Sequence, residues 1–210
     1  MSEATTTTRR RLGTDERRGE IVEAALRIFA TRDVAAVSVE DLAKEAGASA
    51  ALIYHYFGGK QRLAEAALSD AADRLIAGLV VDTTAHTLVQ LDEGLRNYLA
   101  FLADHPVSWS ALLRAGATGA QPGAAVARRV DDHAVALSLA AMGVGGSLPV
   151  LEQALRGWLD LVKGTCLRWL EAGRPEPERL HTLLAGCFIG AVQAAASADP
   201  DCAQAAAALE

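Results

Sequence analysis

The side chains with catalytic potential in this sequence do not form a recognisable reactive group. The nearest arrangement is Asp131, Asp132 and His133, but consecutive residues of a helix point in different directions and cannot converge on one substrate atom. The three cysteines are odd in number and far apart, so they form neither a disulfide framework nor a zinc-binding pattern. We find no phosphate-binding loop and no Ser/His/Asp order. The sequence therefore predicts a protein that is not an enzyme and that needs no cofactor and no metal.

The distribution of charge along the chain bears on whether it could contact nucleic acid. The net charge is −6, but residues 1–60 contain nine Lys/Arg and nine Asp/Glu, whereas residues 61–210 contain eleven and seventeen. The distribution of charge matters more than its total for phosphate contact. A neutral N-terminal part is weak electrostatic evidence, so its arginines must be clustered to favour DNA.

Two groups of arginines at the N-terminus are candidates for DNA contact. Residues 1–14 are polar and lack helical periodicity, and we expect them to form a flexible basic arm. Arg9, Arg10 and Arg11 would reach an adjacent minor groove or the backbone. Arg17 and Arg18 would contact phosphates from the first helix. For any single arginine, a solvated surface charge is an equally good interpretation.

The elements that position these residues are predicted to be helices only. Ala and Leu dominate and aromatic residues make up 5%, which favours helices packed on helices over a sheet. Residues 15–82 are expected to form a three-helix helix-turn-helix head with its connecting helix. Within it, Ser38 and Ser49 are predicted to be helix N-caps, with Asp41 in the capping-box position that Glu or Gln usually takes. Gly47 supplies the turn, because glycine adopts a left-handed conformation without steric cost.

The larger C-terminal part is predicted to span residues 83–204, giving about nine helices in an all-α fold. Helices are expected at residues 87–104, 107–115, 123–142, 148–171 and 178–198, separated by stretches rich in Gly and Pro. Residues 205–210 are expected to be a disordered tail or a vector-derived scar. No apolar run approaches the ~18–20 residues of a membrane span, so we expect a soluble cytoplasmic protein without membrane contact.

The short helix that begins after Ser49 is the candidate DNA-reading element. Ile53 and Phe57 lie four residues apart on its buried face. The outward residues are then Ala50, Ala51, Tyr54 and His55, with part of Leu52. A tight helical pair alone is a weak signal, because most such turns are plain packing.

Three segments of the head resemble the TetR (tetracycline-repressor-like) family of bacterial transcriptional regulators. They are IVEAALRIFA at residues 21–30, SVEDLAKEAGAS at residues 38–49 and LIYHYFGGKQRL at residues 52–63. The resemblance covers roughly residues 15–68 and implies a repressor that binds a palindromic double-stranded DNA operator as a homodimer and is released by a small effector. The alternative is a helical dimeric ligand-binding or interaction protein without specific DNA binding.

The resemblance also implies roles for individual residues of the head. It gives these residues as phosphate contacts: Ser38, Ser49, Tyr54, Tyr56 and Lys60. It directs these residues toward base edges: Ala50, Ala51, Leu52 and His55. The first three of the second group cannot hydrogen-bond to bases, so readout would rest on thymine methyl groups, His55 and DNA shape. Asp33 departs from the glycine that relatives often have there.

An effector pocket is expected among the middle helices of the C-terminal part. Its candidate apolar and aromatic residues are Tyr98, Leu99, Leu102, Trp109, Leu112, Leu113, Leu137 and Trp158. Arg114 and His133 are the candidate polar contacts. Ordinary core packing is the alternative for most of them. Because the set is mainly apolar, a hydrophobic or amphipathic effector is expected.

The last two long helices have apolar stripes wider than one neighbouring helix covers, which favours pairing with a second subunit. The resemblance likewise implies a four-helix dimer interface there. The candidate interface residues are Leu155, Leu159, Val162, Trp169, Leu184, Cys187, Phe188 and Ala191. Core packing within one chain is the alternative.

Overall fold

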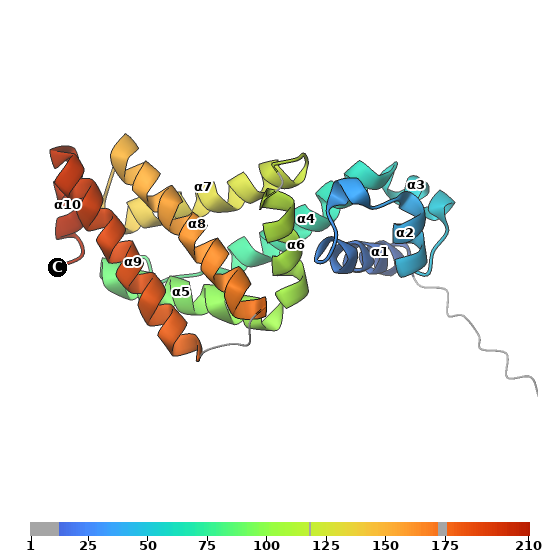
Figure 1. The fold of residues 1–210 in the computed structure, drawn as a ribbon, viewed down its shortest axis with the longest axis horizontal. Coiled ribbons are helices and arrows are strands. Elements are labelled where there is room, and N and C mark those ends of the chain that lie inside the picture. The colour runs from blue at the N-terminus through green and yellow to red at the C-terminus, as the bar shows by residue number, and fades with distance from the viewer. Residues whose placement is uncertain (1–12, 118, 172–175) are drawn as a thin grey trace, which may run out of the picture.

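The fold of the chain is all-helical in a computed structural model that describes residues 13–117, 119–171 and 176–210. Within these ranges it contains ten α-helices, two 3-10 turns and no strand, which confirms the predicted all-α class. Figure 1 shows an elongated molecule in which the first helices form a small unit at one end. Arg9, Arg10 and Arg11 of the predicted arm lie outside the described residues.

The small unit is a head built from α1 (Thr14–Phe29), α2 (Val39–Glu45) and α3 (Ala50–Phe57). Their apolar faces meet in a core that includes Ile21, Phe29, Leu42 and Ile53, each no more than 1% exposed. The turn between α2 and α3 passes through Gly47 at φ +55°, the left-handed conformation predicted from the sequence.

Helix α4 (Lys60–Gly78) joins the head to the rest of the molecule. It packs against α1 and α3 at one end and against the C-terminal helices at the other, as Figure 1 shows. Its buried residues repeat at helical spacing along its whole length, from Leu63 to Leu75.

The body contains α5 (Thr87–Asp104), α6 (Pro106–Ala117), α7 (Gly123–Ala141), α8 (Pro149–Glu171) and α9 (Pro177–Ala198). Helices α8 and α9 pack on each other, α6 packs on α1 and α4, and α7 packs on α4 and α6. Helix α9 is long and apolar enough to cross a membrane by length and composition. It packs against α5 and α8 within the body, and a core helix of a soluble protein passes the same test.

The C-terminus differs from the disordered tail expected for residues 205–210. A 3-10 turn at Pro200–Cys202 leads into α10 (Ala203–Ala207), which packs on α9. Ala205 and Leu209 are buried. The alanine-rich composition suggested low complexity, but alanine is the best helix former and its small side chain permits close packing.

Candidate functional site

Helix α3 presents one face of its surface to solvent at the tip of the head. Ile53 and Phe57 anchor the opposite face in the core, and the Ser49 hydroxyl oxygen accepts a hydrogen bond from the Leu52 backbone N–H at 3.2 Å. Ala51, Tyr54 and His55 are exposed, with Tyr54 55% accessible. The half-buried residues beside them are Ala50, Leu52 and Tyr56. The exposed face is short, mostly uncharged and free of long polar side chains.

Ser38 and Asp41 hold the start of α2 by two reciprocal hydrogen bonds. The Asp41 backbone N–H donates to Ser38 Oγ at 3.0 Å, and the Ser38 backbone N–H donates to Asp41 Oδ2 at 3.1 Å. The hydrogen bonds with Ser38 lower the pKa of Asp41, and the bond from the Ser38 backbone N–H has the largest effect. Arg32 Nη2 lies 3.1 Å from the same Asp41 oxygen. The predicted cap is therefore a full capping box with Asp in place of Glu.

Lys60 occupies a structural position within the head. Its half-buried ammonium donates to the Val37 carbonyl oxygen at 2.8 Å and to the Ala35 carbonyl oxygen at 3.3 Å. Two of its three donors are thereby used to hold the segment that leads into α2. The sequence does not reveal this, because residues 35 and 60 are far apart in the chain.

The arginines of α1 differ from one another in their contacts. Arg17 forms an ion pair with Glu20 at 2.6 Å, and its Nη2 donates to the Gly47 carbonyl oxygen at 2.7 Å. Arg18 lies over the Phe57 ring at 5.0 Å, and no ion pair of Arg18 is present among the described residues. Arg17 thus braces the turn of the head, while the charge of Arg18 remains uncompensated beside α3.

Two further cations of the head have no ion pair within the described ranges, and sequence reasoning missed both. They are Lys44 on α2 and Arg62 on α4, and both are exposed. Arg62 Nη1 lies 3.1 Å from the position that a Cβ atom on Gly58 would take, which puts it beside the end of α3. Tertiary contacts, such as the ion pair of Arg27 with Glu45, decide which cations of the head are paired. The sequence therefore gives no signal that distinguishes paired from unpaired cations.

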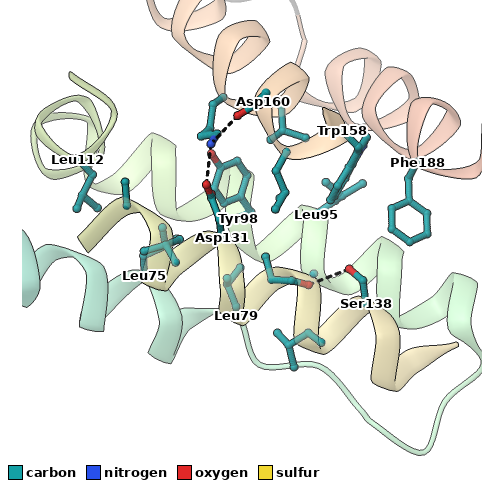
Figure 2. A pocket seen from close by; sticks show the side chains of 18 of the residues that line it. Leu75, Leu79, Leu95, Tyr98, Leu112, Asp131, Ser138, Trp158, Asp160 and Phe188 are labelled. Carbon is teal, nitrogen blue, oxygen red and sulfur yellow. Dashed lines mark hydrogen bonds and ion pairs between the residues drawn. The ribbon is translucent and has the colours of Figure 1, made fainter. Parts of the chain in front are cut away.

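The body contains a cavity of about 520 Å³ that is lined by residues of α4, α5, α6, α7, α8 and α9. Figure 2 shows leucines, Tyr98, Trp158 and Phe188 directed into it. Of the predicted pocket residues, the following line it: Tyr98, Trp109, Leu112, Leu113, Leu137 and Trp158. Such a volume and a mainly apolar wall are typical of a small-molecule site.

Four of the predicted pocket residues do not line this cavity. Leu99 and Leu102 are buried in the core of the body. Arg114 is exposed, and its Nε donates to the Ala30 carbonyl oxygen at the end of α1 at 3.2 Å. His133 is half-buried on α7, on a side that the cavity does not reach. Helix periodicity identified buried faces, but not which part of them borders empty space.

The polar groups of the cavity form two clusters that the sequence did not predict. Trp109 Nε1–H donates to the Tyr98 hydroxyl oxygen at 2.8 Å. Lys163 Nζ lies 2.9 Å from both Asp131 and Asp160. Burial raises the pKa of Tyr98 well above its usual value. Burial also acts to lower the pKa of Lys163, but its hydrogen bonds to the two aspartates outweigh this and keep it raised.

The predicted dimer-interface residues mostly lie inside the chain. The following are buried within the single subunit: Leu155, Val162, Trp169, Leu184 and Phe188. Leu159, Cys187 and Ala191 are half-buried. The outer faces of α8 and α9 instead present Leu161 and Leu183. They also present three glycines at which an added Cβ atom would have no neighbour within 4 Å: Gly157, Gly186 and Gly190.

No group of three His, Cys, Asp or Glu in the described residues is arranged to hold a metal ion.

Comparison with known families identifies both parts of the chain. Residues 21–67 match bacterial regulatory proteins of the tetR family. Residues 87–191, half of the chain, match the tetracyclin repressor-like C-terminal domain. The chain belongs to the TetR family. TetR-family proteins are transcriptional regulators that bind DNA through a helix-turn-helix, so the resemblance seen in the sequence is confirmed.

Individual relatives support this membership, both in structure and in sequence. A solved tetR-family transcriptional regulator from Streptomyces coelicolor is 32% identical over 94% of this chain and 90% of its own, with a TM-score of 0.77. The repressor KstR2 of Mycobacterium tuberculosis is 37% identical over 79 residues, and the regulator BetI of Agrobacterium fabrum is 51% identical over 47. These two matches span only 40% and 23% of the relatives' own lengths.

Proposed function

We propose that this TetR-family protein is a cytoplasmic repressor that binds a palindromic operator as a homodimer and is released by a small apolar effector. Two recognition helices related by a two-fold axis would enter successive major grooves ~34–36 Å apart. An effector that favours a different separation would weaken DNA binding, and coupling of this kind typically amounts to ~1–3 kcal/mol.

The observation that best supports effector control is that α4 belongs to both sites. It packs against α1 and α3 of the head, while Leu75 and Leu79 near its C-terminal end line the cavity. A molecule in the cavity would therefore contact the helix on which the head rests. Arg129 of α7 also contacts this helix, through an ion pair with Asp73 at 2.7 Å.

DNA contact by the exposed face of α3 would combine apolar base contact with phosphate contacts. Ala51 would meet thymine methyl groups, and His55 would be the polar base contact. Hydroxyl donors to phosphate would be Ser38, Ser49, Tyr54 and Tyr56. Lys60 would add its remaining donor. Arg18 keeps its predicted phosphate contact and we add Arg62, because no carboxylate neutralises either arginine within the described head.

A homodimer would use the outer faces of α8 and α9. Glycines there permit close approach of a second pair of helices, and Leu161 and Leu183 would become buried. Half-buried Cys187 and Ala191 would border the contact. The five predicted interface residues that are buried within the subunit would support this surface from below.

A mobility-shift assay with DNA from upstream of the protein's own gene tests the proposal. Tyr54→Ala should weaken binding strongly, because it removes a proposed phosphate contact. The Tyr54 side chain is exposed and makes no core contact, so circular dichroism should show that the fold is retained. Val80→Ala, at another highly exposed position outside the head, is the matched control and should bind like the wild type. Equal binding by the Tyr54 variant would contradict the assignment of the DNA-contacting face.

A protein that binds ligands or partners without specific DNA binding remains the second candidate, because the exposed face of α3 lacks Asn, Gln and Arg. Selection of bound genomic fragments separates the two functions. Fragments that share a palindrome support the regulator, whereas fragments without a common sequence support the alternative.

A further inference from the structure

The ligand class of the cavity follows from the direction of one hydrogen bond. The indole N–H of Trp109 is a donor only, so at 2.8 Å from the Tyr98 hydroxyl it must donate and the Tyr98 oxygen must accept. The phenolic O–H of Tyr98 is then left to donate. No acceptor for that proton is present among the described residues.

The other uncharged side-chain donors of the cavity wall are already used inside the protein. Thr87 Oγ1 donates to the Ala141 carbonyl oxygen at 2.7 Å, and Ser138 Oγ donates to that of Ala134 at 2.9 Å. Gln90 Nε2 donates to the Ala85 carbonyl oxygen at 2.8 Å. Trp158 Nε1 donates to the Leu184 carbonyl oxygen at 3.0 Å. Among the uncharged side chains of the described cavity wall, Tyr98 is therefore the donor that a ligand can engage.

The charges near Tyr98 argue against an anionic partner at this point. Lys163 is bound by both Asp131 and Asp160, so these three residues together are negative. The charge of Asp131 acts on Tyr98, in the direction that disfavours a second negative charge there. Figure 2 shows Asp131 and Tyr98 side by side in the cavity. A carboxylate would be repelled. A cationic group would be attracted by the net negative charge, but it has no lone pair that could accept the Tyr98 proton.

Arg128 also lines the cavity, but it does not change this conclusion. It is exposed, and an exposed ion pair with a ligand carboxylate gains little in water. The rest of the wall is dominated by leucine, valine, alanine and aromatic residues. An aliphatic body is therefore favoured for the bulk of the ligand.

We infer that the cavity binds an uncharged, largely aliphatic molecule with one carbonyl oxygen, which accepts a hydrogen bond from Tyr98. Ketones, esters and lactones share this chemistry. The inference rests on the proposed effector function, since it names the class of molecule that would occupy the same cavity.

Intrinsic tryptophan fluorescence without DNA provides the test. Two of the three tryptophans, Trp109 and Trp158, line the cavity, Trp169 is buried on α8 outside the cavity lining, and the head has none, so ligand-dependent quenching reports mainly on the cavity. The probes are 2-undecanone, undecane, decanoate and decyltrimethylammonium. We expect the full-length protein to bind 2-undecanone tighter than the other three.

Two variants then assign the preference to Tyr98. Tyr98→Phe keeps the ring and should weaken 2-undecanone binding about three- to tenfold, with undecane binding unchanged. Ser138→Ala, at a cavity hydroxyl that donates to backbone, is the matched control and should keep the ketone-to-alkane ratio. An unchanged ratio in Tyr98→Phe, tighter binding of either ionic probe, or no binding of any probe would overturn the inference.

These outcomes are distinct from failure of the proposed function. A protein that binds 2-undecanone through Tyr98 but not operator DNA keeps this inference and loses the proposed regulator. A protein that binds its operator and prefers decanoate keeps the regulator and loses the carbonyl ligand.

Discussion

Ser38 and Asp41 illustrate how single side chains shape the DNA-facing head. Their reciprocal hydrogen bonds satisfy two backbone N–H groups that the first turn of α2 would otherwise leave without a partner. The same bonds favour the ionised form of Asp41 and lower its pKa. The stability of this helix start should therefore depend on pH.

The sign of that dependence follows from the lowered pKa. Ionised Asp41 stabilises the folded state above its usual pKa of 3.8, and this contribution is lost as the pH falls through the lower folded pKa. Asp41→Asn should reduce the free energy of unfolding at neutral pH, with a difference from wild type that shrinks below pH 3.8. Urea unfolding followed by circular dichroism measures this.

Asp33→Asn is the matched control for this pH series. It removes the same charge from the preceding segment, and the Asp33 side chain makes no capping hydrogen bond. We expect its difference from wild type to be small throughout. A pH-independent loss in the Asp41 variant would mean that the carboxylate charge contributes nothing to the cap.

At the scale of elements, α4 matters most, because its two ends have different surroundings. Leu68 is fully buried and does not line the cavity, whereas Leu75 is buried but borders the cavity. Truncation of a leucine costs about 2–5 kcal/mol, and the cost depends on how many contacts are lost. The same substitution at the two positions should therefore have unequal effects.

Leu68→Ala should lower the free energy of unfolding more than Leu75→Ala does. We expect about 4 kcal/mol for the first and about 2 kcal/mol for the second, since Leu75 already lacks neighbours on its cavity side. Denaturant unfolding gives both values, and the two variants serve as controls for each other. Equal losses would indicate that the cavity around Leu75 is closed in solution.

At the scale of the whole molecule, the outer faces of α8 and α9 are the surface to test. Leu183 is 53% exposed, and a charge buried there in an interface would lack a partner. Leu183→Glu should convert a dimer of 22.0 kDa chains into monomers with unchanged helicity, as measured by sedimentation equilibrium. The monomer should also bind operator DNA far more weakly, because one head gives modest affinity.

Val80→Glu provides the control, since Val80 is 71% exposed in the connection between α4 and α5. It should leave the wild-type assembly intact. A wild-type protein that sediments as a single chain, or a Leu183 variant that stays dimeric, would exclude the proposed interface.

What the sequence predicts well here is determined by neighbouring residues. The caps at Ser38 and Ser49 and the left-handed turn at Gly47 depend on local hydrogen bonds and backbone sterics. The head was further specified by its family motifs. These features were predicted because each of them involves residues within a few positions of one another.

What the sequence misses is determined by contacts between distant segments. Lys60 binds carbonyl groups 23 and 25 residues away, and Arg114 contacts Ala30, 84 residues away. The family resemblance gave Lys60 as a phosphate contact, and Arg114 was predicted as a polar contact of the effector. Likewise, the stripes of α8 and α9 revealed apolar surface but not which part neighbouring helices of the same subunit already cover.

The position of the chain's end has a practical consequence for labelling. Figure 1 shows the C-terminus after α10 at the opposite end of the molecule from α1, α2 and α3. A fluorophore or reporter domain attached beyond Glu210 would therefore sit far from bound operator DNA. An attachment ahead of α1 would instead crowd the duplex, so single-molecule measurements of operator binding should use the C-terminal site with a spacer after buried Leu209.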